Sequence, residues 1–148
     1  MGCDIHMFVE KHTEDGWQSA DHYIKNPYYC ISYVTGETEP EYEVQEIWSG
    51  QNYRLFYLLA GVRNEGDLTP ISDPKGLPSD VTEFVRGESE KLGSDGHSHS
   101  YLSLSEIKAH KDDEGILKEL IQRMEWRKKD MDLWGSDEKI RIVFWFDS

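Results

Sequence analysis

The sequence is poor in cysteine and lacks long apolar runs. Only two cysteines, Cys3 and Cys30, occur in 148 residues, so a disulfide framework is not expected. No apolar run approaches the roughly 20 residues that a membrane-spanning helix needs. The N-terminus also lacks the basic and apolar regions of a signal peptide. These absences predict a protein of the cytoplasm that does not enter a membrane.

Basic residues are scarce as well. The chain has 16 Lys and Arg against 29 Asp and Glu, a formal net charge of −13. Repulsion from phosphate therefore disfavours broad nucleic-acid binding and binding to an anionic membrane surface. An acidic surface keeps a protein soluble, and it can also attract a basic partner.

Aromatic residues, in contrast, are abundant. Five Trp, eight Tyr and five Phe make up 12 % of the chain, and the hydrophobic fraction is 37 %. Large aromatic side chains bury the most area per residue, and a chain of this length can form a core without disulfides. We therefore expect one globular domain over residues 1–148.

The clearest strand patterns lie near the two ends of the chain. Residues 3–11 alternate apolar and polar side chains, with Asp4 and His6 on the polar face. Residues 139–147 are apolar at nearly every position, which is typical of a strand buried on both faces. We expect these two strands to be neighbours at the centre of a sheet, with further strands from Trp17 and over 42–48.

Helical spacing of apolar residues and capping signals mark the helices. The predicted helices cover 52–61, 79–92 with Ser79 as its cap, a third that starts at Ser103, and 115–129. Polar residues, glycine and proline predict loops over 62–78 and 93–100. The expected fold is α+β, a mainly antiparallel sheet with about three helices packed on one face.

Three histidines fall in two polar segments and could form a metal site. His97 and His99 are two residues apart, so in extended backbone both imidazoles would point the same way. Asp95 precedes them, and His6 could approach from the first strand. Three or four such ligands suit a divalent ion such as zinc. The alternative is a loop whose rings form hydrogen bonds with the backbone.

Asp4 and His6 form a second candidate pair. A carboxylate two residues from an imidazole on one strand face can orient the ring and raise its basicity. Asp4, His6 and His97 are therefore the candidates for catalysis. The alternative is the exposed polar face of an edge strand.

The loop over 62–78 carries cations that are rare in this acidic chain. Arg63 and Lys75 could neutralise a phosphate or a carboxylate, or Arg63 could pair with an internal acid. A tyrosine could stack on a base. The ligand-binding candidates are Tyr53, Arg63, Asn64, Lys75, His97, His99 and Tyr101.

Several strings recur together in a known order: Met1-Gly2-Cys3-Asp4-Ile5-His6, Asn52-Tyr53-Arg54-Leu55-Phe56, Gly61-Val62-Arg63-Asn64, Gly76-Leu77-Pro78, and Asp95 to Leu104. In this combination the chain resembles a family of small uncharacterised proteins carried mainly by bacteriophages and prophages. The resemblance implies a phage accessory protein made in the cytoplasm of a bacterial host cell. It implies no catalytic roles.

Three functional hypotheses follow. In the first, the protein binds a small anionic, nucleotide-like ligand in a pocket lined by His and Arg, and sequesters a signal of host immunity. In the second, it is a hydrolase in which His6, Asp95, His97 and His99 hold a divalent metal ion that activates water. In the third, it is an acidic protein that inhibits a host enzyme by binding it. The sequence leaves homo-oligomer formation open.

Overall fold

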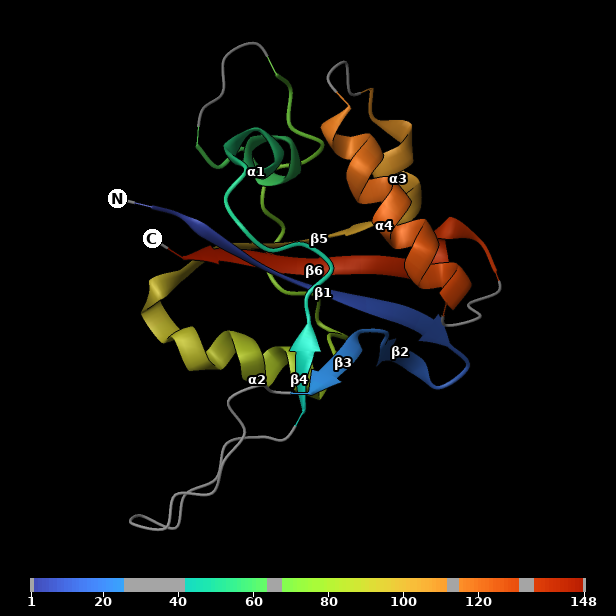
Figure 1. The fold of residues 1–148 in the computed structure, drawn as a ribbon. Coiled ribbons are helices and arrows are strands. Elements are labelled where there is room, and N and C mark those ends of the chain that lie inside the picture. Colours follow the sequence, from blue (N-terminus) through green and yellow to red (C-terminus); the bar gives the residue numbers. More distant parts are fainter. Residues whose placement is uncertain (1, 26–41, 64–67, 112–114, 131–134, 148) are drawn as a thin grey trace, which may run out of the picture.

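The computed structural model describes residues 2–25, 42–63, 68–111, 115–130 and 135–147 (Figure 1). Its main sheet has four strands in the order β2-β1-β6-β5, and β3 and β4 form a separate two-stranded sheet. All strand pairs are antiparallel. The strands are β1 (Asp4–Thr13), β2 (Gly16–Ser19), β3 (His22–Lys25), β4 (Tyr42–Gln45), β5 (Gly96–Ser103) and β6 (Ile140–Asp147).

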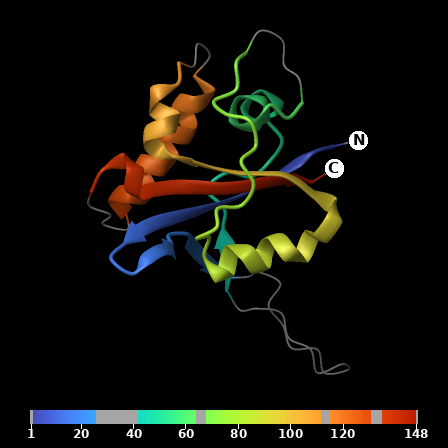
Figure 2. The ribbon, with the colours of Figure 1, turned by 180° about the vertical axis from the view of Figure 1, so that it is seen from behind.

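Helices cover both faces of the main sheet. The helices are α1 (Tyr53–Ala60), α2 (Glu83–Leu92), α3 (Leu104–Ala109) and α4 (Ile116–Asp130), with the 3-10 turns η1 (Gly93–Asp95) and η2 (Asp137–Lys139). α1, α3 and α4 lie on one face, and α2 lies on the other (Figures 1 and 2). The predicted α+β class, with three helices on one face, is confirmed. The sequence pattern gave no sign that the helix predicted over 79–92, which corresponds to α2, would pack on the opposite face.

The main core lies between the sheet and the three-helix face. β6 pairs along its whole length with residues 4–11 of β1, with Met7 opposite Phe144 and Val9 opposite Ile142. Their apolar side chains pack against buried residues of all three helices, such as Phe56, Ile107 and Leu120. Every residue of β6 from Ile140 to Phe146 is buried. The predictions of a central β6 and of β1 as its neighbour are confirmed.

The α2 face holds a smaller apolar cluster and a buried ion pair. Phe8, Val143 and Trp145 pack there against Val85 of α2. At one end of this face, Arg141 Nε donates a hydrogen bond of 2.8 Å to Glu10. The other oxygen of Glu10 accepts from the backbone N–H of Thr82, the N-cap of α2. The ion pair therefore fixes the start of α2 over the sheet.

Local capping signals placed most helix ends correctly. The Asn52 side chain caps α1, and Gly61 ends it in the left-handed conformation. Ser103 and Glu106 form the predicted capping box of α3. The predicted Ser79 cap is wrong, because α2 is capped by Thr82. The strand predicted over 42–48 ends earlier, since β4 stops at Gln45.

The segment predicted as a polar loop over 93–100 forms η1 and then part of β5. The prediction was wrong because β5 lies at the edge of the sheet and lacks alternating apolar residues in this part. Between His97 and Ser100 its register against β6 shifts, and Ser98 has a positive φ of 56°. Three steps along β5 match two steps along β6, which is the geometry of a β-bulge.

None of the described helices is long and apolar enough to span a bilayer.

Breaking the buried ion pair should destabilise the fold. Arg141→Met leaves Glu10, a fully buried carboxylate, without its cation, and removing one partner of a buried pair typically costs about 3–5 kcal/mol. We expect a loss of that size in the free energy of unfolding, measured by urea denaturation. Lys118→Met, at an exposed position of α4, serves as the control and should change it by less than about 0.5 kcal/mol.

Candidate functional site

The bulge in β5 sends the two neighbouring histidines to opposite faces of the sheet. His97 stacks on Phe146, a residue of the main core, with ring centroids 6.2 Å apart. His99 stacks on Trp145, on the α2 face, at 5.6 Å. A regular strand would have pointed both rings the same way. The extra residue at the bulge removes that alternation, so the two imidazoles do not face one ion.

His6 and His99 instead flank a shared indole ring. His6 lies opposite Trp145 in the pairing of β1 with β6. Its ring stacks on Trp145 with centroids 6.1 Å apart, and His99 stacks on the same indole from β5. The fold therefore brings these two histidines to one face of the sheet, as expected, but Trp145 lies between them.

Two carboxylates from distant parts of the chain hold His6. Its Nε2 lies 2.5 Å from Asp147 of β6, and its Nδ1 lies 3.8 Å from Glu46, which follows β4. Burial of Glu46 raises the pKa of its carboxyl group, against the opposing effects of His6 and of a hydrogen bond from the Met7 N–H. Asp4, the predicted partner of His6, instead accepts a hydrogen bond from Gln51.

His99 is held by a serine of α2. Its Nε2 lies 3.0 Å from the hydroxyl of Ser89. Burial, with a smaller contribution from His97, lowers the pKa of His99, which favours the neutral imidazole. Ser89 itself is only 8 % exposed, so this hydrogen bond orients the ring under α2 and does not present a nucleophile to solvent.

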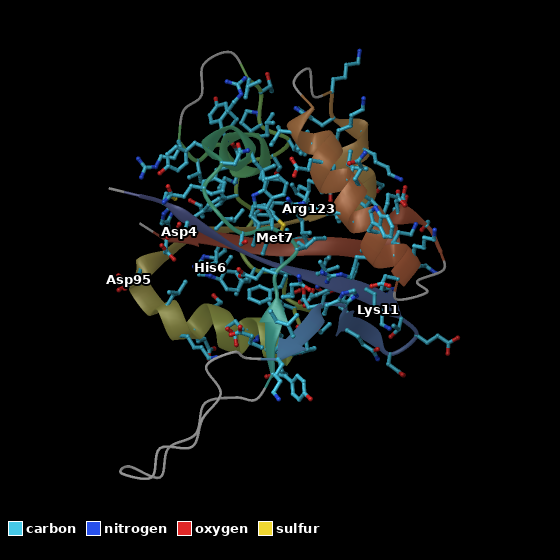
Figure 3. All side chains as sticks on the ribbon, viewed as in Figure 1. Asp4, His6, Met7, Lys11, Asp95 and Arg123 are labelled. Atoms are coloured by element: carbon cyan, nitrogen blue, oxygen red, sulfur yellow. The ribbon has the colours of Figure 1, made fainter. Side chains whose placement is uncertain are left out.

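The residues predicted to bind a metal do not gather around one point. Asp4, His6 and Asp95 lie at the same end of the molecule (Figure 3). Within the described ranges, however, no three His, Cys, Asp or Glu side chains are arranged to hold a metal ion. Zinc binding by His6, Asp95, His97 and His99 stays a prediction. A stoichiometric metal that is lost in His97→Ala would support it.

The predicted ligand-binding residues separate into two groups. Arg63 lies over the ring of Tyr53 on the α1 side, 5.0 Å from its centroid. Lys75 lies over Tyr101 at 4.2 Å and forms an ion pair with Glu106 at 3.3 Å. Lys75 therefore already has an anionic partner within the protein. The remaining candidate of this loop, Asn64, lies outside the described residues.

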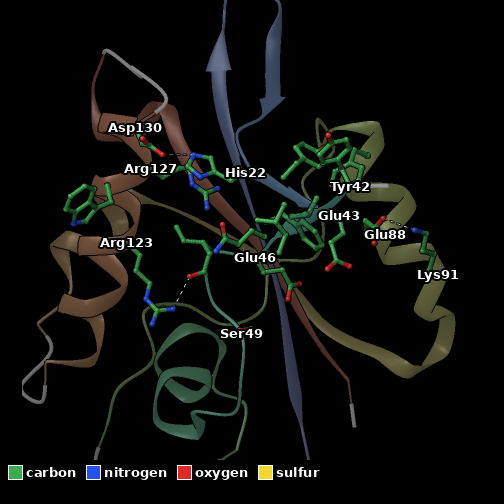
Figure 4. A pocket seen from close by; sticks show the side chains of 18 residues that line it. His22, Tyr42, Glu43, Glu46, Ser49, Glu88, Lys91, Arg123, Arg127 and Asp130 are labelled. Carbon is green, nitrogen blue, oxygen red and sulfur yellow. Dashed lines mark hydrogen bonds and ion pairs between the residues drawn. The ribbon is translucent and has the colours of Figure 1, made fainter. Parts of the chain in front are cut away.

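A large groove lies between α2 and α4, with the two-stranded sheet of β3 and β4 between them (Figure 4). We call this sheet the β3–β4 ribbon and the hollow around it the α2–α4 groove. Its volume is about 1210 Å³. The groove is lined by Phe8, His22, Tyr23, Ile24, Tyr42, Glu43, Val44, Gln45, Glu46, Ile47, Ser49, Phe84, Glu88, Lys91, Arg123, Trp126, Arg127 and Asp130.

Exposed apolar side chains concentrate on this groove. The large hydrophobic residues that are exposed in the described part of the chain number four, and all of them line it. They are Tyr23, Ile24, Tyr42 and Trp126, and Trp126 is 69 % exposed. Single exposed apolar residues are ordinary, but a cluster of them around one hollow is typical of a binding surface.

The cations of the groove already have partners, whereas part of its negative charge does not. Arg123 pairs with Glu119, and Lys91 pairs with Glu88, each at 2.8 Å. The structure shows no ion pair or hydrogen bond for the side chain of Glu43 among the described residues. The one ion pair that it shows for Glu46 among them is with the imidazole of His6. The surplus charge in the groove is therefore negative.

A buried pair fixes the point where the chain enters the β3–β4 ribbon. Arg127 of α4 donates to the carbonyl of Ala20 at 2.9 Å and lies 3.5 Å from Asp21 Oδ1. That oxygen also accepts from the Val9 N–H, while Asp21 Oδ2 is buried without a partner. Burial raises the pKa of Asp21 to about 7, although the Val9 hydrogen bond and Arg127 act in the opposite direction.

The sequence pattern missed both the partners of His6 and the exposed residues of this groove. Glu46 and Asp147 contact His6 although they lie 40 and 141 residues away in the sequence. These contacts depend on the strand register. Trp126 lies in a helix whose amphipathic pattern was recognised, and its position outside the apolar stripe was the one signal that could have marked it as exposed.

Comparisons of the chain with protein-family models, with curated proteins and with solved structures found no match. The family resemblance drawn from the motifs thus stays a prediction. The site must be interpreted from its own geometry.

Asp21 should make stability depend on pH. Its pKa is about 7 in the folded protein, against an ordinary value of 3.8, so the folded state retains a proton that the unfolded chain has lost. The stabilisation from this proton is fully present below about pH 4 and is lost as the pH rises to 7, by at most about 1.4 kcal/mol per pH unit.

Asp21→Asn removes this titration. We expect the free energy of unfolding of the wild type, minus that of the variant, to fall steadily between pH 4 and 7 in urea titrations. Asp15→Asn, in the exposed turn after β1, should show no such trend. A constant difference for Asp21→Asn would mean that this carboxyl group titrates at its ordinary pKa.

Proposed function

We propose that the protein binds another protein, and that the α2–α4 groove receives a basic segment of that partner. The observation that carries the proposal is the gathering of Tyr23, Ile24, Tyr42 and Trp126 around one hollow that also holds Glu43 and Glu46. Aromatic residues dominate the energetics of protein interfaces, with Trp and Tyr the most frequent centres of binding energy.

The size of the groove favours a polypeptide over a small ligand. Pockets for small molecules usually enclose about 300–1,000 Å³ and are largely sealed from solvent. This groove has about 1210 Å³ and is bordered by side chains that are 42–69 % exposed. A side chain such as Trp126 would lose its water contact only when a partner covers it, and that burial stabilises the complex.

The charge of the groove favours a basic partner. Glu43 of β4 and Glu46, which follows β4, both line it (Figure 4), and the whole chain carries a net charge of −13. Lys or Arg side chains of a partner can pair with these carboxylates and lie over Trp126 or Tyr42 in cation–π contacts. The long-range field of the protein would also speed the encounter at low salt.

This proposal develops the hypothesis of an acidic binding protein. That the partner is a host enzyme, and that the protein comes from a bacteriophage, stay predictions. The hypothesis of a nucleotide-like ligand keeps its own test, the binding of labelled nucleotides to the wild type and to Arg63→Ala. It has less support from the described residues, because Lys75 is already paired with Glu106.

A library of displayed random peptides tests the proposal without knowledge of the natural partner. Wild-type protein should enrich peptides that combine Lys or Arg with apolar residues. Trp126→Ala should weaken binding of an enriched peptide at least about tenfold in calorimetry, because it removes an exposed aromatic anchor. The double variant Glu43→Gln, Glu46→Gln should weaken it and reduce its dependence on salt.

The matched control for the charge change is Glu14→Gln, Asp15→Asn in the exposed turn between β1 and β2. It alters net charge by the same amount at two residues that do not line the groove, and it should leave peptide affinity within about twofold. Enrichment of acidic peptides, or binding that is indifferent to Trp126→Ala, would refute the groove as the site.

A further inference from the structure

Each strand of the β3–β4 ribbon has an outer edge with which no other described strand pairs. The two strands form a sheet of their own, and every residue of β4 lies opposite a residue of β3. Among the residues that the structure describes, it shows no hydrogen bond between Tyr42–Gln45 and any element other than β3. The backbone N–H and C=O groups on the outer edge of β4 can therefore pair with a further strand.

The ribbon brings these edges into the α2–α4 groove. Residues 22–24 and 42–45 are part of its lining, and the ribbon lies between the two helices (Figure 4). A two-stranded sheet is marginal on its own in water, and a third strand stabilises it. Extended peptides bind other proteins by adding a strand to an exposed sheet edge, where main-chain hydrogen bonds give affinity and alternate side chains give specificity. The groove has the parts that this mode of binding needs.

The charges of the two strands distinguish their edges. β3 carries His22 and Lys25, whereas β4 carries Glu43 and is followed by Glu46. Within the ribbon Glu43 lies opposite Ile24, so its cross-strand neighbour is not a cation. Opposite charges on adjacent strands are stabilising, and like charges are destabilising. A basic segment is therefore favoured beside β4 and disfavoured beside β3.

The alternation of side chains along β4 specifies a pattern for the partner segment. Val44 packs against the apolar cluster of the α2 face, which includes Phe8 and Trp145. Tyr42, two residues away, shares this face of the ribbon, and Glu43 lies on the other face. Residues directly opposite each other on adjacent strands have their side chains on the same face. Apolar residues therefore suit the positions opposite Tyr42 and Val44, and Lys or Arg suits the position opposite Glu43.

We propose that the basic segment of the partner adds to the outer edge of β4 as a third strand of the ribbon, with a Lys or Arg opposite Glu43 between two apolar residues. This inference deepens the proposed function and rests on it, because it states how the segment lies in the groove. Main-chain hydrogen bonds to β4 hold the segment, and the Glu43 carboxylate selects the cation. A second copy of this chain suits the edge poorly, since two chains with a net charge of −13 repel each other.

Peptides enriched from the displayed library test the inference through their pattern. Their sequences should alternate apolar and basic residues. N-methylation of a synthetic copy, one amide at a time, removes single main-chain donors. We expect the affinity measured by calorimetry to fall about tenfold at every second residue, where a hydrogen bond to β4 is lost, and to change less than about threefold at the residues between.

An exchange of charges identifies the position opposite Glu43. Glu43→Lys should weaken binding of the basic peptide about fivefold or more, because like charges then face each other. Replacement of one peptide cation by Glu should restore the affinity of this variant to within about twofold of the original pair. The control is Glu90→Lys, at an exposed position of α2 that does not line the groove. It changes net charge equally and should keep peptide affinity within about twofold.

Amide hydrogen exchange of the complex identifies the edge. The outer-edge amides of β4 should gain at least about tenfold protection when the peptide binds, and the outer-edge amides of β3 should not. Protection at the outer edge of β3 in place of β4, or N-methyl effects without a two-residue period, would overturn strand addition and leave the groove as a binding site. A library that enriches no peptide would overturn the proposed function and this inference with it.

Discussion

The antiparallel pairing of β1 with β6 joins the two ends of the chain at the centre of the sheet. Because side chains alternate along each strand, this one register divides the molecule into two chemically different sides. Met7 and Phe144 point into the core under α1, α3 and α4, while Glu10 lies opposite Arg141 on the α2 side. A shift of one residue would bury the charged set in the main core.

The α2 side is where the structure combines charge with aromatic rings. The Glu10–Arg141 pair fixes the N-terminus of α2, and α2 then covers Trp145 and forms one wall of the groove. His6 connects these features, since it stacks on Trp145 and contacts the groove residue Glu46. The stability of this face and the shape of the groove therefore depend on the same few polar contacts.

Strong local signals made several elements predictable. The continuous apolar run of β6, the Asn52 cap of α1 and the capping box at Ser103 are properties of neighbouring residues, and each was recognised correctly. β5 was missed because its polar edge sequence carries no alternating pattern, and the cap of α2 was misplaced because Glu10, far away in sequence, selects Thr82. The candidate site was predictable only in part, since His6 and His99 do share a face but with Trp145 between them.

By itself the sequence determined the acidic charge, the α+β class, the central strand and the ends of most helices, because composition and short-range periodicity act within a few residues. Only the tertiary structure decided which polar side chains meet. The bulge at Ser98 separated His97 from His99, and the β1–β6 register brought Asp147 to His6. The packing of α2 and α4 around the ribbon gathered Tyr23, Tyr42 and Trp126 on one groove. Such contacts depend on strand register and on helix packing. Both bring together residues that are far apart in the sequence, so a local sequence pattern cannot specify them.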